Sequence, residues 1–223
     1  MRLAVVVGAR GGIGAALCEA LRRDADYDEV IALGRPEIDL ADEESVARAA
    51  AAWPADAVRL IVNAAGFLHD ETQGPEKSLR DLDAAKLRRV FEINALGPAL
   101  LMKHALPRLP RRGRSVFACL SARVGSIGDN RLGGWYGYRA SKAALNQFVR
   151  TAAIELRRSH PEAICVALHP GTVATPLSAP FRREGLDVVS PDQAARNLLA
   201  VIAKLQPADS GLFFDPRGVP VPW

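Results

Sequence analysis

Tyr138 and Lys142 are the residues of this 223-residue chain whose types and spacing best suit catalysis. They lie four positions apart in a run with helical periodicity, and such residues project from the same face of a helix. A phenol has an ordinary pKa near ~10 and is a poor acid at neutral pH. A fixed ammonium beside it favours the phenolate and lowers that pKa toward the range of a general acid or base. The alternative interpretation is an amphipathic helix with an exposed lysine, so the elements around the pair must decide.

Composition indicates one globular domain, residues 1–223, because 49% of the residues are hydrophobic and 24% are charged. No apolar run reaches the length of a membrane span, and the run at residues 1–7 ends at glycines without a signal-peptide cleavage site. We therefore expect no membrane insertion. The three cysteines are far apart and lie in apolar segments, which predicts free buried thiols in a reducing compartment, the cytoplasm.

A formal charge of +4 and a pI near 9.2 raise the question of nucleic-acid binding. The arginines are scattered, apart from a cluster at residues 108–114 beside prolines. A solvated surface loop explains that cluster better than a nucleic-acid site, so we expect no nucleic-acid partner. The four histidines have no metal-ligand spacing, which predicts no metal site.

The first forty residues have the pattern of a nucleotide-binding unit. Residues 2–7 form an apolar run typical of a buried strand, and residues 15–23 have helical periodicity. Between them lies the glycine loop, residues 8–14. Glycines at a strand-to-helix turn let the backbone approach a pyrophosphate, which the free amides of the helix N-terminus can bind, although glycines also serve plain tight turns.

The second strand, residues 30–33, ends at Gly34 and Arg35. In dinucleotide-binding folds a carboxylate at this point favours a free ribose 2′-hydroxyl, whereas an arginine favours a 2′-phosphate. Arg35, joined by Arg10 of the glycine loop, predicts a preference for NADP(H), with NAD(H) as the alternative; an exposed arginine without a ligand is the competing interpretation. The link to residues 38–40 is too short for a crossover helix.

The remaining segments alternate between strands and helices, which predicts a parallel sheet with helices on both faces, an α/β Rossmann-type fold. Residues 83–109 have helical periodicity that we expect to be interrupted at Gly97-Pro98. Ser190, with Pro191 and Gln193 after it, predicts the start of a capped helix. The other expected elements are helices at 42–53 and 138–158 and strands at 58–62, 115–120, 163–168 and 211–214.

Several polar or small residues follow directly after expected strands, where ligands bind in parallel sheets. They are Asn63, Ala64, Ala65 and Gly66 after one strand, Ser121 after the next, and the segment from Pro170 to Thr175 after a third. These segments should therefore converge with the glycine loop on one edge of the sheet.

Together, in this order, the motifs resemble those of the short-chain dehydrogenase/reductase family over nearly the whole chain. The resemblance rests on Gly8-x-x-x-Gly12-x-Gly14, Asn63-Ala64-Ala65-Gly66, Tyr138-x-x-x-Lys142, and Pro170-Gly171 with Thr175. Val7 replaces the family's usual threonine, and Ala64 replaces its second asparagine. The run 121–136, the short link 35–40 and the end at Pro222-Trp223 also resemble the C-factor-like branch, named for a cell-to-cell signalling protein.

The resemblance implies a role for each of four catalytic residues. Tyr138 would protonate the carbonyl oxygen as hydride arrives, and Lys142 would lower the pKa of Tyr138 and hold the nicotinamide ribose. Ser121 would donate a hydrogen bond to the substrate oxygen. Asn94 would interrupt helix bonding to hold a proton-carrying water. Ser126 lies nearer the family's usual spacing from the tyrosine, but Ser121 follows a strand end, where geometry is fixed, and is preferred.

The resemblance also implies a cofactor site. Asp39 would contact the adenine with Leu40 beside it, and Val173 and Thr175 would bind the carboxamide. The full expected set is Gly8, Arg10, Gly11, Gly12, Ile13, Gly14, Arg35, Asp39, Leu40, Asn63, Ala64, Ala65, Gly66, Tyr138, Lys142, Pro170, Gly171, Val173 and Thr175.

The predicted function is therefore an NADP(H)-dependent reductase of a small carbonyl compound, or a dehydrogenase of the corresponding alcohol. The alternative is a cofactor-binding signalling protein with incidental turnover. A substrate lid is expected at residues 176–185, with Leu177 and Phe181 as apolar contacts and Arg182 and Arg183 as anion contacts. The helices around Asn94 and Tyr138 resemble those through which the family forms homodimers and homotetramers.

Overall fold

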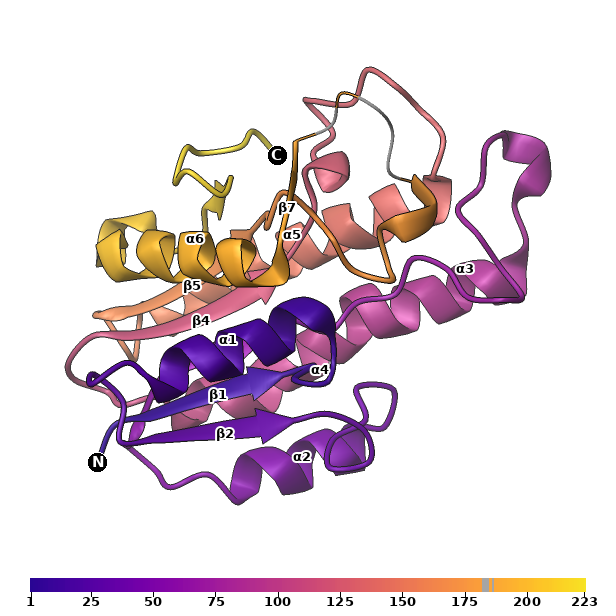
Figure 1. Cartoon of the computed structure of the whole chain (residues 1–223). Helices are drawn as coiled ribbons and strands as arrows, with labels where there is room; N and C mark the ends of the chain where they lie inside the picture. The colour runs from indigo at the N-terminus through magenta and orange to yellow at the C-terminus, as the bar shows by residue number, and fades with distance from the viewer. Residues whose placement is uncertain (182–184, 186) are drawn as a thin grey trace.

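The core of the computed structural model is a six-stranded parallel sheet (Figure 1), and the structure describes residues 1–181, 185 and 187–223. The strand order is β2-β1-β3-β4-β5-β8, so the chain starts inside the sheet and extends it in both directions. A separate two-stranded ladder pairs β6 with β7. The strands are β1 (Leu3–Val7), β2 (Glu29–Leu33), β3 (Val58–Asn63), β4 (Ser115–Leu120), β5 (Ala163–Leu168), β6 (Thr172–Val173), β7 (Val188–Val189) and β8 (Phe213–Phe214).

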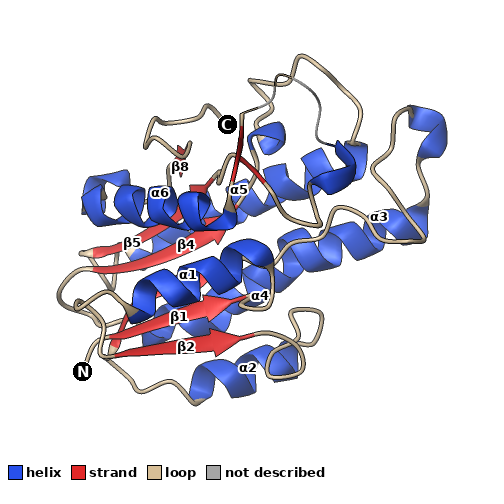
Figure 2. Ribbon diagram, viewed as in Figure 1, coloured by secondary structure: helices blue, strands red, loops and turns tan. Residues whose placement is uncertain are grey.

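Helices cover both faces of the sheet, which confirms the Rossmann-type α/β fold (Figure 2). Helices α1 and α6 pack together on one face, and α2, α4 and α5 lie on the other, with α3 leading into α4. The helices are α1 (Gly12–Arg22), α2 (Glu43–Ala51), α3 (Ala84–Phe91), α4 (Gly97–Ala105), α5 (Tyr136–Leu156) and α6 (Pro191–Lys204).

The central strands are apolar at almost every position because both of their faces are buried. Successive side chains alternate between two cores: Val5 and Val7 belong to the core under α2, α4 and α5, whereas Ala4 and Val6 belong to the core under α1 and α6. Strand β2 is different, since it is a half-exposed edge. The described residues of the link after it, 34–42, form turns and no helix, as its length predicts.

The helical run before β4 departs from the expected pattern. Gly97 and Pro98 do not interrupt it; they begin α4, and the irregularity lies just before them, in a π-helical turn at Glu92–Leu96. Pro98 has no amide hydrogen, so the carbonyl of Asn94 lacks its ordinary partner four residues on. The amide of Gly97 bonds instead to the carbonyl of Glu92, five residues back. The widened turn is centred on Asn94.

Side chains terminate several elements. Asp42, Asp83 and Ser190 cap α2, α3 and α6 by accepting backbone amides of the first turn. In the basic cluster, Arg108 donates to the carbonyl of Trp53 and Arg114 to that of Ile202, so both bind carbonyls released where helices end. Within the described residues, no helix is long and apolar enough to cross a bilayer.

Candidate active site

Tyr138 and Lys142 lie on one face of α5, at the carboxyl edge of the sheet. The Nζ atom of Lys142 donates to the carbonyl oxygen of Leu120, the last residue of β4, at 2.9 Å. The same atom is 5.8 Å from the ring centroid of Tyr138. Lys142 is only 3% exposed. The strand end therefore fixes the ammonium beside the phenol ring.

Burial dominates the electrostatics of this pair. It raises the pKa of Tyr138 to about 12 and lowers the pKa of Lys142 to about 8, because both charged forms lose their hydration. The lowering of the phenol pKa that the sequence predicts is therefore not found. Desolvation outweighs the ammonium, whose hydrogen bond goes to the Leu120 carbonyl. Tyr138 is consequently held as a neutral proton donor.

Asn94 uses its side chain to tie the π-helical turn to the loop after β3. Its Oδ1 accepts from the amide of Phe67 at 2.8 Å, and its Nδ2 donates to the Phe67 carbonyl at 2.7 Å and to Ser141 Oγ at 3.2 Å. A Cβ placed on Gly66 would lie 3.5 Å from Lys142 Nζ and 3.7 Å from Asn94 Oδ1. Asn94 and Lys142 thus border the same small space, and the water that the resemblance implies there stays a prediction.

Ser121 lies directly after β4, but its side chain forms a hydrogen bond with a residue of α5 other than Tyr138. Its Oγ donates to Oδ1 of Asn146 at 2.6 Å. Asn146 is one further helical turn along the face that carries Tyr138 and Lys142, and its Nδ2 has no partner within the described part of the chain. Sequence reasoning missed Asn146, although its spacing of eight residues from Tyr138 would have placed it on the same face.

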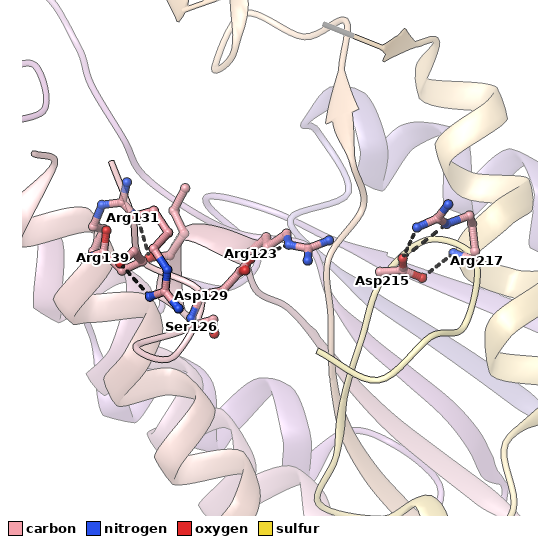
Figure 3. A network of polar contacts seen from close by, with 9 residues as sticks. Arg123, Ser126, Asp129, Arg131, Arg139, Asp215 and Arg217 are labelled. Carbon is pink, nitrogen blue, oxygen red and sulfur yellow. Dashed lines mark hydrogen bonds and ion pairs between the residues drawn. The ribbon is translucent and has the colours of Figure 1, made fainter. Parts of the chain in front are cut away.

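Ser126, the alternative serine, is used by the loop that follows Ser121. Its Oγ accepts from the amide of Asp129 at 3.1 Å. The Asp129 carboxylate in turn accepts a hydrogen bond from Arg123 Nε at 2.5 Å. Figure 3 shows Arg123 between this carboxylate and Asp215. Asp215 is paired with Arg217. Ser126 therefore stabilises a polar loop network, whereas Ser121 faces the helix that carries the tyrosine.

The glycine loop packs too closely for side chains at several positions. Gly8 has φ +83°, and a Cβ on it would lie 2.6 Å from the amide nitrogen of Ala65; a Cβ on Gly14 would lie 2.1 Å from the carbonyl oxygen of Gly8. Gly11 caps α1 without a side chain, and the first turn of α1 has no acidic residue. The first amides of α1, at Gly12, Ile13 and Gly14, therefore remain available to an anion. Thr175 lies against this turn, since its Cγ2 would be 2.8 Å from a Cβ on Gly12.

The segments that we expect to contact the adenosine half of the cofactor lie at the ends of β2 and β3. Asp39 Oδ1 accepts from the amide of Ala41 at 3.0 Å, and Leu40 is buried beside it. Asn63 Oδ1 accepts from the amide of Ala65 at 3.2 Å, which shapes the Asn63–Gly66 turn. Arg35 is exposed at the end of β2.

Arg10 of the glycine loop forms an ion pair with Glu37, at 2.7 Å between Nη2 and Oε1. The sequence interpretation placed no carboxylate at the end of β2. It overlooked Glu37. This residue lies three positions after Gly34, where the turn begins, and the turn brings its side chain to Arg10 at the end of β2.

The segment after β5 forms the other side of the site. Pro170 and Gly171, with φ +84° at the glycine, turn the chain into β6, where Val173 is buried. The amide of Ala174 then bonds to the carbonyl of Val189 at 2.9 Å, so the β6–β7 ladder closes the base of the expected lid. Arg182 and Arg183 lie outside the described residues.

Trp135 and His69, which sequence reasoning missed, form an aromatic group with Phe181 next to Tyr138. The ring of Trp135 lies edge-on to Tyr138, with centroids 6.1 Å apart, and edge-on to Phe181 at 4.9 Å. His69 contacts the Phe181 ring at 5.3 Å, and its Nε2 lies 3.1 Å from the carbonyl oxygen of Leu177. Trp135, Phe181 and His69 line a cleft of about 850 Å³ next to α5. Phe181 is thus placed where a lid contact is expected.

Comparison with known proteins agrees with this arrangement. The family model described as enoyl-(acyl carrier protein) reductase matches residues 5–204. A dehydrogenase from Rhodococcus sp. (strain AD45), 1-hydroxy-2-glutathionyl-2-methyl-3-butene dehydrogenase, is 33% identical, and the match covers 100% of both chains. The chain belongs to the short-chain dehydrogenase/reductase family. It is therefore an oxidoreductase by descent.

Other known proteins are similar over most or all of the chain. The C-signal protein of Myxococcus xanthus is 40% identical over 167 residues, which covers 74% of this chain and 93% of that protein. The NADPH-bound carbonyl reductase from chicken fatty liver has the same fold, with a TM-score of 0.85 at 24% identity over 100% of both chains. A Burkholderia multivorans protein, described as a short-chain dehydrogenase/reductase with bound NADP, is 25% identical with a TM-score of 0.80, and the match covers 100% of this chain and 99% of that one.

Proposed function

We propose that the protein is an NADP(H)-dependent oxidoreductase that reduces the carbonyl group of a small molecule or oxidises the corresponding alcohol. The observation that carries the proposal is the pair formed on α5 by half-buried Tyr138 and buried Lys142, fixed by the hydrogen bond from Lys142 to the end of β4. The pair lies at the sheet edge to which the glycine loop also belongs. A neutral phenol and a cation at this edge are the groups that proton transfer to a carbonyl oxygen requires.

The residues present fit a dinucleotide. Gly8 and Gly14 keep the strand-to-helix turn free of side chains, and the uncapped first turn of α1 offers amides to a pyrophosphate. Arg10 and Arg35 at the end of β2 supply positive charge for a 2′-phosphate. The similarity to the NADP-bound Burkholderia multivorans protein supports the preference for NADP(H).

When bound, NADPH supplies a hydride to the carbonyl carbon. Tyr138 donates its hydroxyl proton to the carbonyl oxygen, and the Lys142 ammonium stabilises the phenolate left behind. Ser121 donates a hydrogen bond to the same oxygen after rotating its hydroxyl away from Asn146. Asn94 holds the loop after β3 against the helix, which keeps the space beside Lys142 open for a proton-carrying water.

The proposal is tested first by titrating the protein with NADPH and NADH while following nicotinamide fluorescence. We expect NADPH to bind more tightly than NADH, and Arg35→Ala to weaken NADPH binding while leaving NADH binding unchanged. Carbonyl compounds are then screened, with Tyr138→Phe as the variant that binds NADPH but does not reduce. Failure of both cofactors to bind would refute the proposal.

A second candidate function is favoured by the similarity to C-signal. In this interpretation the protein binds NADP(H) as part of a signalling role and its turnover is incidental. Tight NADPH binding without reduction of any carbonyl compound, and with no difference between the protein and Tyr138→Phe, would support it. Reduction that depends on Tyr138 would support the enzyme instead.

We also propose that the protein works as a homo-oligomer in the cytoplasm. A groove of about 600 Å³ between the outer faces of α4 and α5 is lined by Ala99, Met102, Phe148 and Ala152, among others. Phe148 is 39% exposed there, which suits burial against a second copy. The three cysteines are free and buried, as the sequence predicts, which favours a reducing compartment.

A further inference from the structure

A carboxylate of the chain itself lies where the proposed function places the 2′-phosphate of the cofactor. Glu37 Oε1 accepts from Arg10 Nη2 at 2.7 Å, at the carboxyl end of β2. The stem of Arg10 crosses Gly34 on its way there, since a Cβ on Gly34 would lie 3.0 Å from Arg10 Cγ. Arg10 therefore reaches the strand end because residue 34 has no side chain, and it meets an anion when it arrives.

Backbone groups converge on the same carboxylate. The amide of Glu37 itself, the guanidinium of Arg10 and the amide of Gly34 all hold the pKa of Glu37 below its usual range. Backbone amides and guanidinium groups are also the donors that bind phosphates in proteins. Arg35, exposed next to it, adds a second positive charge. The donors that would bind a phosphate at this strand end are thus already directed at an anion.

We propose that Glu37 occupies the 2′-phosphate site from within and competes with NADP(H) for Arg10. This inference rests on the proposed function, because it assigns Glu37 a role in the same cofactor site. A phosphate and a carboxylate repel each other, so they cannot both form a full set of hydrogen bonds with the Arg10 guanidinium. The Glu37 side chain is 45% exposed, so its carboxylate can move into solvent when the phosphate binds.

The competition has a consequence for cofactor choice. A ligand with a 2′-phosphate must displace Glu37, whereas a ligand with a free 2′-hydroxyl leaves the Arg10–Glu37 pair intact. Glu37 therefore weakens the binding of NADP(H) but not that of NAD(H). It reduces the preference for NADP(H) over NAD(H) that Arg10 and Arg35 create. Removing its charge should widen that preference.

The test isolates this half of the site with adenosine 2′,5′-bisphosphate, compared with 5′-AMP, by isothermal titration calorimetry at low salt. The proteins are the wild type, Glu37→Gln and the control Glu29→Gln. Glu29 is an exposed glutamate at the opposite end of β2, so the control removes an equal charge away from the site. We expect Glu37→Gln to bind the bisphosphate about threefold or more tightly than the wild type. Binding of 5′-AMP should be unchanged, and Glu29→Gln should match the wild type.

Equal or weaker binding of the bisphosphate by Glu37→Gln would overturn the inference. So would a loss of 5′-AMP binding, which would make Glu37 an acceptor for the ribose hydroxyls instead. NADPH titration of the same proteins separates the two proposals. If the wild type binds NADPH but Glu37→Gln binds it no more tightly, only the proposed role of Glu37 fails. If no protein binds NADPH or either nucleotide, the proposed function fails with it.

Discussion

Lys142 is the residue whose protonation should set the upper pH limit of the reaction. Its pKa of about 8 means that it is charged at neutral pH and loses its proton as the pH rises through that value. Tyr138, with a pKa of about 12, remains a proton donor across the same range. The rate of carbonyl reduction should therefore fall above pH about 8, because the phenolate formed by proton transfer loses its stabilising cation. The measurement is kcat/KM against pH.

Lys142→Arg provides the control, since a guanidinium keeps its charge throughout this range. The variant should be slower, because its planar group fits the Leu120 carbonyl differently, but its profile should lose the fall near pH 8. A fall that persists unchanged in Lys142→Arg would assign it to another group.

Ser121 and Asn146 act as a unit in the structure, and this separates the two candidate serines. Ser121→Ala should lower kcat by about 100-fold, the effect of losing a hydrogen bond to a developing oxyanion. Asn146→Leu should lower it by about tenfold, because Ser121 loses the polar neighbour that fixes the position of its side chain before the hydroxyl turns to the substrate. Single-turnover reduction at saturating NADPH measures both effects.

Ser126→Ala is the comparison, as its Oγ accepts the amide of Asp129 within the loop. Its effect on kcat should be small beside that of Ser121→Ala. The opposite order would transfer the catalytic role to Ser126.

At the scale of elements, the start of α5 is fixed by a residue far away in sequence. Glu76 is 8% exposed; its Oε2 accepts from the amide of Gly137 at 3.0 Å, and its carbonyl oxygen accepts from the amide of Trp135 at 2.5 Å. Trp135 has φ +54°, a left-handed conformation that a bulky side chain rarely adopts. Glu76 therefore holds the residue that adjoins Tyr138 in a conformation that it would not adopt unaided.

Glu76→Ala should reduce the free energy of unfolding by about 1–2 kcal/mol, as expected for the loss of a charged helix cap. It should also raise the KM for carbonyl substrates, because Trp135 lines the cleft, while leaving NADPH affinity unchanged. Urea unfolding and steady-state kinetics measure the two effects. Glu76→Gln, which keeps an acceptor oxygen, should restore much of both; if it behaves like Glu76→Ala, shape at this position matters more than capping.

The elements that the sequence predicts best are those with purely local signals. Strands 115–120 and 163–168 have the predicted bounds because apolar runs buried on both faces begin and end abruptly. The interruption expected at Gly97-Pro98 lies at Glu92–Leu96 instead, because the effect of the missing Pro98 amide appears four residues earlier. This turn includes Asn94, where the resemblance implies that helix bonding is interrupted. The cap on α5 could not be predicted, since Glu76 and Gly137 are 61 residues apart. Glu37 was missed for the same reason: only the fold brings it to Arg10.

At the scale of the whole molecule, the exposed faces of α4 and α5 should determine the oligomeric state. Phe148→Glu places a charge in the groove between these helices and should shift the protein toward monomers, because a buried interface would have to desolvate that charge. Light scattering after size-exclusion chromatography measures the mass. The control is Arg196→Glu, which introduces a negative charge on α6, on the opposite face of the sheet from α4 and α5. This variant should have the same mass as the wild type. A monomeric wild type would contradict the proposed oligomer.

The position of Trp135 also gives the molecule an internal optical reporter. Indole emission overlaps the absorption of reduced nicotinamide, so a tryptophan edge-on to Tyr138 should lose fluorescence to a bound reduced cofactor by energy transfer. Trp53 is buried under α2 at 3% exposure, and Trp223 stacks on Phe213 of the edge strand β8. Replacing these two with phenylalanine would leave a single emitter beside the reacting groups. Its quenching would then follow cofactor binding directly, before any substrate is identified.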